Sequence, residues 1–540
     1  MAANSSDPQT YNWNDSLNGS FLWSNVNFGE AITEVMTPLT WSVLRFTLDD
    51  WIFLPGYPTV GNIGGFPYLN ISIFATVYRM VGRSQAALLK YMEAVMYMRL
   101  PEEMQIPLIP VSPASIFSGL RSTLRVQNKQ KDGLKRLPAY LDGNLAWFKN
   151  MRARIASETS QPALAALWKA EISPHIKDGV WTVLGTASYS ADYTMDLRRR
   201  LAALVGEQDA SLLITTQSSN NDPLPSLEPA IGIARVAGGE LSRSAYLEQF
   251  GHRGPHEFEL SVPHPAEDPR WLDQELANFK ASPVDIPALL QKQRAEFQAA
   301  WLRLSAKHPR QSESIRRQVA ESARRVRLRE QARSAYTRDR WLVRLFALRA
   351  AELAGIGGDI FFLYLEEVLA LLAGDRSALQ FVPARRENYR QFKSLPPYPP
   401  ILRGSFEPFI WAAGPRRSSG IFDAQQAVSP AEGNIIRGAA GSAGQVVGFV
   451  RRLDDASQGA ALKPGEILVT TLTDVSWTPL FPRLAAVVTD VGAPLSHAAI
   501  VAREMGIPAV VGCGNATMRL KTGDRVRVDG GRGTVEILAG

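Results

Sequence analysis

His497 stands in a segment whose residue types are suited to phosphoryl transfer. The segment LAAVVTDVGAPLSHAAIVAREMGIPAVVG (484–512) predicts a buried strand, a turn at Gly492 and Pro494, and a helix capped by Ser496. His497 is then expected at the helix N-terminus, where unpaired amides and the helix dipole stabilise a phosphate dianion. The same dipole favours a neutral imidazole, as a nucleophile requires. By position alone, the alternative is a capped, half-buried structural histidine.

A second group of candidate side chains lies in HRGPHE (252–257). His252, His256 and Glu257 are residue types that bind metals, but the glycine and proline between them break any helix and its ligand geometry. The sequence therefore predicts no metal site. The segment is either a structural loop or the lining of a substrate or phosphate cleft. In the second case Arg253 is the best-suited member, with His252 beside it, because a guanidinium can bind two phosphate oxygens.

Arg329 and Arg333 are four residues apart in an arginine-rich stretch, 310–349, and share one face of a predicted helix. The net charge of +7 owes much to this stretch. Three interpretations stay open: a solvated helix face partly paired with glutamates, a phosphate-binding face, or a nucleic-acid surface. No zinc-finger spacing or RNA-recognition signature supports nucleic acid, which is the least favoured of the three.

The elements that position these residues fall into three predicted regions. From about residue 76 to 375, apolar residues recur three and four apart, so 1–375 is predicted to be a mainly α-helical body. Residues 376–430 are rich in proline and glycine and predict a connector. Residues 431–540 alternate strands and helices. The strands are expected at 445–450, 467–471, 485–489, 509–511, 525–528 and 534–538. We therefore predict a multidomain chain with a C-terminal α/β domain.

Composition narrows the class of protein. With 540 residues, 45% hydrophobic and 21% charged, the chain has the composition of a globular protein rather than a disordered or fibrous one. It has no run of about 20 apolar residues and no basic-then-apolar start, so we expect no membrane association and no signal peptide. The single cysteine, Cys513, excludes an intramolecular disulfide and favours a cytoplasmic location.

Three C-terminal stretches resemble the swivelling phosphohistidine (mobile) domain of the phosphoenolpyruvate-utilising enzymes, which include phosphoenolpyruvate synthase. They are PGEILVTTLTDVSWTPLF (464–481), VTDVGAPLSHAAIVAREMGIPAVVG (488–512) and TGDRVRVDGGRGTVEIL (522–538). In the body, 13–43 and 246–273 resemble the helical substrate-binding domain of the rifampicin phosphotransferase branch.

The resemblance implies roles for individual residues. His497 would be the phosphorylated residue, with Thr489, Ser496 and Arg503 as supports of its phosphate. Arg329 and Arg333 match a basic pair that faces the transferred phosphate from the helical domain.

The resemblance also implies a reaction. In this family the terminal two phosphates of ATP pass to the histidine; one leaves as inorganic phosphate, the other moves to substrate, and AMP remains. The sequence opens on the substrate-domain motif, so we expect an ATP-grasp partner protein to bind ATP and Mg²⁺ in trans. The phosphate would then pass to a hydroxyl-bearing small molecule. The alternative is a non-catalytic ligand-binding or sequestering protein that has lost its nucleotide domain.

Overall fold

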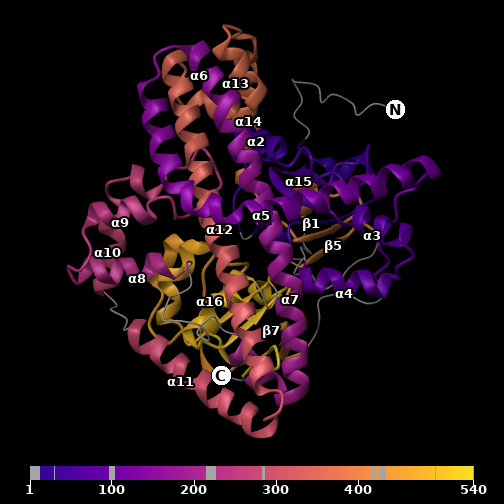
Figure 1. Cartoon of the computed structure of the whole chain (residues 1–540), viewed down its shortest axis with the longest axis vertical. Helices are drawn as coiled ribbons and strands as arrows, with labels where there is room; N and C mark the ends of the chain where they lie inside the picture. The colour runs from indigo at the N-terminus through magenta and orange to yellow at the C-terminus, as the bar shows by residue number, and fades with distance from the viewer. Residues whose placement is uncertain are drawn as a thin grey trace.

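The computed structural model describes residues 13–538 except 30, 96–103, 215–224, 226, 282–285, 415–419, 426–432, 493 and 495. A largely helical body is followed by a C-terminal α/β domain, drawn in yellow beside the lower half of the long helices in Figure 1. Within the described residues, no helix is long and apolar enough to cross a membrane.

Three long helices form the centre of the body. They are α5 (Pro113–Ser157), α7 (Ser173–Leu213) and α12 (Ser312–Ala354). Their core contains Trp168 and Phe346, whose rings lie 4.7 Å apart between centroids. Helix α12 ends at Gly355, which adopts the left-handed conformation that a glycine C-cap favours.

Shorter helices surround this bundle. They are α1 (Val26–Gly29), α2 (Pro38–Thr47), α3 (Ile71–Met80), α4 (Gln85–Val95), α6 (Gln161–Leu167), α8 (Glu228–Ala237), α9 (Arg243–Phe250), α10 (Trp271–Ala281), α11 (Ile286–Lys307), α13 (Leu365–Leu372), α14 (Val382–Lys393) and α15 (Pro408–Ala413). Of these, α8, α9 and α10 share a small core of their own, built on Ile233, Tyr246, Phe250, Leu272 and Leu276.

The body also contains a five-stranded sheet that the sequence analysis did not predict. Its order is β2 (Val60–Ile63), β3 (Phe66–Asn70), β1 (Leu22–Ser24), β4 (Ile401–Arg403) and β5 (Ile421–Asp423). The strands β4 and β5 come from the predicted connector, 376–430, and β4 pairs antiparallel with β1. Most of the described part of that segment is therefore built into the body. Residues 415–419 and 426–432 lie outside the described residues.

The C-terminal domain is built on an eight-stranded mixed sheet. Its order is β6 (Ile435–Arg437), β13 (Thr534–Ile537), β12 (Arg525–Asp529), β8 (Gln445–Arg452), β9 (Ile467–Thr470), β10 (Ala486–Thr489), β11 (Ala509–Val511) and β7 (Ala439–Ser442). The strands from β8 to β11 are parallel, and α16 (His497–Met505) connects β10 to β11. The six predicted strands are present, whereas β6 and β7 were not expected.

The arginine-rich stretch lies on α12, and much of it binds within the body. Arg340 donates to the carbonyl of Phe258 at 3.1 Å, and Arg344 pairs with Glu267 at 3.0 Å. Arg340 and Arg344 are both buried. This half of α12 is therefore an interior helix and not a solvated basic face, although Nε and Nη1 of Arg340 are buried without a hydrogen-bond partner among the described residues.

Candidate functional site

The predicted strand–turn–helix around His497 is confirmed. Strand β10 leads into Gly492, whose φ of 140° lies in the region that glycine tolerates. Ser496 then caps α16, its hydroxyl accepting from the amide of Ala499 at 3.4 Å. His497 is the first residue of the helix and is 5% exposed. Its ring therefore lies at the positive end of the helix dipole.

Both ring nitrogens of His497 have threonine partners. Thr473 Oγ1 lies 3.0 Å from Nδ1, and Thr478 Oγ1 lies 3.2 Å from Nε2. Phe481 meets the ring edge-to-face at 6.0 Å between centroids. All three belong to the loop and 3-10 helix η8 (Val475–Arg483) that follow β9. Sequence reasoning missed these threonines, although it singled out their segment, because nothing local to 473–478 shows which hydroxyl will reach the histidine.

Charges from the body act on this ring. Burial and the charge of Arg333 lower the pKa of His497 to about 3, with smaller contributions from Arg253 and Arg329, while Glu330 opposes them. The imidazole is therefore neutral at physiological pH, as phosphoryl acceptance requires. The three arginines predicted as phosphate contacts thus lie within electrostatic reach of His497, although they are more than 160 residues from it in sequence.

Arg253 has a free donor at this site. Its Nε binds Glu257 Oε2 at 2.9 Å, and both side chains are almost fully buried. Its Nη2 is buried and has no hydrogen-bond partner among the described residues. A buried guanidinium nitrogen without a partner is costly, so this atom is suited to an anionic oxygen of a ligand. Arg329 is paired at 3.0 Å with Glu330, whose pKa the arginine charges hold low against the effect of burial.

Other predicted residues have structural contacts. His252 Nε2 lies 2.9 Å from Ser334 Oγ, and burial lowers its pKa well below the usual value. Arg503 donates to the carbonyls of Gly441 at 2.6 Å and Pro494 at 2.7 Å, and Thr489 donates to the carbonyl of Val491 at 2.8 Å. These last two side chains hold the turn before His497. Their role in binding phosphate stays a prediction.

A cavity of about 300 Å³ lies beside this site, between α8–α10 and the C-terminal domain. Arg253 and Thr478 are both in its wall, so the cavity adjoins the residue with the unpartnered guanidinium nitrogen and the residue whose hydroxyl contacts His497 Nε2. Much of the remaining wall is apolar, including Ile233, Phe279 and Leu480. A small molecule with an apolar body fits such walls.

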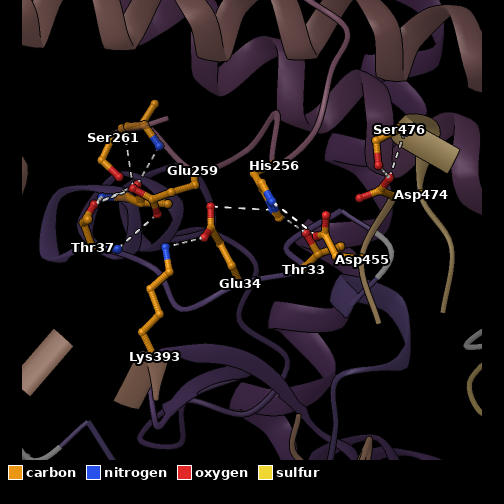
Figure 2. A network of polar contacts seen from close by, with 12 residues as sticks. Thr33, Glu34, Thr37, His256, Glu259, Ser261, Lys393, Asp455, Asp474 and Ser476 are labelled. Atoms are coloured by element: carbon orange, nitrogen blue, oxygen red, sulfur yellow. Dashed lines mark hydrogen bonds and ion pairs between the residues drawn. The ribbon is translucent and has the colours of Figure 1, made fainter. Parts of the chain in front are cut away.

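A second set of polar contacts joins the body to the C-terminal domain (Figure 2). His256 lies 3.6 Å from Glu34 in the body and 3.8 Å from Asp455 in the C-terminal domain. Its Nδ1 also lies 3.0 Å from the hydroxyl of Thr33. With a φ of 54°, His256 is the one non-glycine residue with positive φ among the described residues. Such strain is kept where surrounding contacts impose it.

No group of three metal-ligating side chains occurs in the part of the chain that the structure describes. Burial raises the pKa of Asp474, which faces the charges of Glu257 and His256 across the same interface. The polar side chains here contact one another and the partner domain. They therefore act as docking contacts.

Apolar packing and backbone contacts complete the docked arrangement. Val326 of α12 and Leu227, which precedes α8, share a core with residues of the C-terminal domain that include Leu480 and Ala498. Arg198 of α7 donates to the carbonyl of Ala440 at 3.2 Å. The cavity and the environment of His497 are thus products of the two parts packed together.

Comparison with known proteins agrees with this site. Residues 462–533 match the family "PEP-utilising enzyme, mobile domain". The chain is 35% identical over 312 residues to the prodigiosin synthesizing transferase PigC of Serratia marcescens. The aligned residues cover 55% of this chain and 33% of PigC. It is 31% identical over 324 residues to a rifampicin phosphotransferase of Streptomyces sviceus, covering 57% of this chain and 36% of the relative.

A third relative matches a shorter part of the chain. A probable phosphoenolpyruvate synthase of Pyrococcus abyssi is 52% identical over 101 residues, 19% of this chain and 12% of that protein. The chain thus spans about a third or less of the length of these curated relatives. Residues 462–533 are thus similar to the mobile domain of PEP-utilising enzymes, and about half of the chain is similar to rifampicin phosphotransferases.

Proposed function

We propose that this chain is a phosphotransferase component in which His497 carries a phosphoryl group to a hydroxyl-bearing small molecule. The observation that carries the proposal is the arrangement at the cavity. Thr478, the partner of His497 Nε2, and Arg253, with its unpartnered Nη2, lie in the same wall. A phosphoryl group on Nε2 would have a cationic donor and an acceptor cavity beside it.

In the proposed transfer, one bond to phosphorus forms as another breaks. The acceptor hydroxyl oxygen attacks phosphorus, an O–P bond forms, and the P–Nε2 bond of His497 breaks. Nitrogen keeps the bonding electron pair, and the proton of the hydroxyl ends on the imidazole. Arg253 binds the phosphoryl oxygens, and Thr473 at Nδ1 holds the ring in one orientation.

The phosphoryl donor is proposed to be ATP, bound with Mg²⁺ by an ATP-grasp partner protein. The net reaction is ATP, water and acceptor giving AMP, inorganic phosphate and the phosphate ester. Names of the relatives support phosphotransfer in general: two are rifampicin phosphotransferases. A cytoplasmic location belongs to the same proposal, because the ATP pool is there.

The proposal is tested by mixing the chain with Mg²⁺, a candidate ATP-grasp protein and ATP labelled in its β-phosphate. We expect acid-labile, alkali-stable label on the chain that is absent from His497→Ala. The matched control is His308→Asn, a histidine on the edge of the helical body whose ring contacts the carbonyl of Leu204. Label that is unchanged in His497→Ala would overturn the proposal.

The second candidate function is ligand binding without catalysis. The observation that favours it is the same cavity, whose largely apolar wall can hold a ligand whether or not His497 is phosphorylated. Tight ligand binding that is indifferent to His497→Ala, together with no phosphorylation by any ATP-grasp partner, would identify this function.

A further inference from the structure

Helix α10 turns a mostly polar face toward the cavity. Trp271, Gln274, Glu275, Asn278 and Phe279 all line it, and their spacing of three and four residues places them on one side of the helix. The other side of α10 packs into the small core that α8, α9 and α10 share. Figure 1 shows these three helices grouped beside the C-terminal domain. The polar face is therefore held toward the ligand space by the packing behind it.

Glu275 is the one acidic side chain in the described lining of this cavity. Neither cation of the described lining pairs with Glu275. Arg253 pairs with Glu257 and keeps Nη2 unpartnered within the described part of the chain. Arg483 donates to the carbonyls of Gly459 and Leu462 and keeps its Nε unpartnered there as well. Among the described residues the carboxyl of Glu275 has no ion-pair partner, and its hydrogen bond comes from Asn278. Burial accordingly raises the pKa of Glu275.

Other buried carboxylates near the site are compensated. Glu257 has Arg253 at 2.9 Å and Glu330 has Arg329 at 3.0 Å. Glu259 accepts hydrogen bonds from the amide and hydroxyl of Thr37 and from the amide of Ser261. A carboxylate that is largely withdrawn from water needs a cation or several donors. Glu275 differs from these neighbours because it faces empty space that a ligand can enter.

We propose that Glu275 is a specificity-determining residue that selects apolar acceptors carrying a protonated amine or another basic nitrogen. The walls favour the same chemistry, because Trp271 and Phe279 line the cavity and aromatic rings attract cations as well as apolar groups. The inference rests on the proposed function in that it treats the cavity as the acceptor site. The preferred acceptor then has two features: a hydroxyl for the phosphoryl group and a basic nitrogen for Glu275.

Three probes of one skeleton test this inference: 2-phenylethylamine, 2-phenylethanol and phenylacetate, which are cationic, neutral and anionic at pH 7. Ligand-observed NMR titration of the full chain gives their affinities. We expect the amine to bind about tenfold more tightly than the alcohol, because a hydrogen bond to a charged group in a buried site contributes on that scale. Glu275→Gln should abolish this preference and leave the affinity of the alcohol unchanged.

The matched control is Asp273→Asn, on the exposed side of the same helix, where Asp273 pairs with Arg243 at the surface. It should keep the preference for the amine. Equal affinities of amine and alcohol in the native chain, a preference that survives Glu275→Gln, or no binding of any probe would each overturn the inference. His497→Ala should not alter the preference, so loss of phosphorylation and loss of amine selection are separate results.

Discussion

The hydroxyl of Thr478 lies 3.2 Å from Nε2 of His497, and Thr478 is one of the residues that line the cavity. The two nitrogens of the ring are therefore not equivalent: Nε2 is on the side of the cavity through Thr478, whereas Thr473 occupies Nδ1. In the proposed transfer, Nε2 is therefore the nitrogen that would accept and give the phosphoryl group.

Thr473→Val should slow phosphorylation of His497 about tenfold, because Nδ1 of the buried ring loses the hydroxyl of Thr473, which helps to fix the orientation of the ring. Thr473→Ser should restore the rate, since it keeps the hydroxyl. The measurement is the initial rate of β-phosphate labelling with an ATP-grasp partner in excess. A Thr473→Val rate equal to that of the native chain would contradict a positioning role.

Arg253→Gln should lower the free energy of unfolding by about 3 kcal/mol, because Glu257 is left buried without its cation. The double variant Arg253→Gln with Glu257→Gln should recover most of this loss, since neither charge remains. Urea unfolding of the native chain and both variants checks the result. Equal stabilities of the single and double variants would show that the pair is not coupled.

The same double variant tests the role of Arg253 in phosphate binding, because it lacks the guanidinium but should keep most of the stability of the native chain. We expect it to bind inorganic phosphate about tenfold more weakly than the native chain, because the free Nη2 of Arg253 is gone. Isothermal titration calorimetry gives the affinities. Arg235→Gln, on the half-exposed surface of α8, is the control and should bind phosphate normally. Unchanged phosphate affinity in the double variant would remove Arg253 from the phosphate site.

Asp455→Asn should shift the equilibrium between docked and undocked C-terminal domains by about threefold toward the undocked state. The reason is that His256 loses its contact across the interface, and partly exposed ion pairs contribute modestly. Fluorescence transfer between dyes on Lys307→Cys and Lys521→Cys, with Cys513→Ala, reports docking. Asp454→Asn changes the neighbouring exposed carboxylate and should leave docking unaltered. An equal shift in both variants would show a general charge effect.

The buried His497 should make the native chain sensitive to acid. Its pKa is about 3 when folded against an ordinary 6.5, so below pH 6.5 the unfolded chain binds a proton that the folded chain does not. Folding is therefore weakened as the pH falls from 6.5 toward 3. Between pH 7.5 and 5, His497→Asn should lose about 2 kcal/mol less unfolding free energy than the native chain. If the unfolding free energies of the native chain and of His497→Asn fell equally with pH, this would contradict the burial of a neutral imidazole.

Local features of the histidine segment could be predicted from sequence because they depend on residues close together in the chain. The Ser496 cap reaches an amide three residues away, and Gly506 ends α16 in the left-handed conformation that glycine adopts without strain. The six C-terminal strands could be predicted for the same reason, because each is an apolar run bounded by turn residues nearby in the chain. The sheet of the body was missed because its strands are short and pair over long distances, as Leu22 does with Arg403.

The sequence by itself therefore determined the strand–turn–helix that carries His497, the candidate nucleophile, and the residue types able to bind phosphate. Only the tertiary structure decided which of them meet. Arg253, Thr478 and Glu275 come together at one cavity because the C-terminal domain packs against α8–α10 and α12, and that contact joins surfaces from distant parts of the chain. The complementarity of such surfaces depends on many side chains at once, so no local pattern records it.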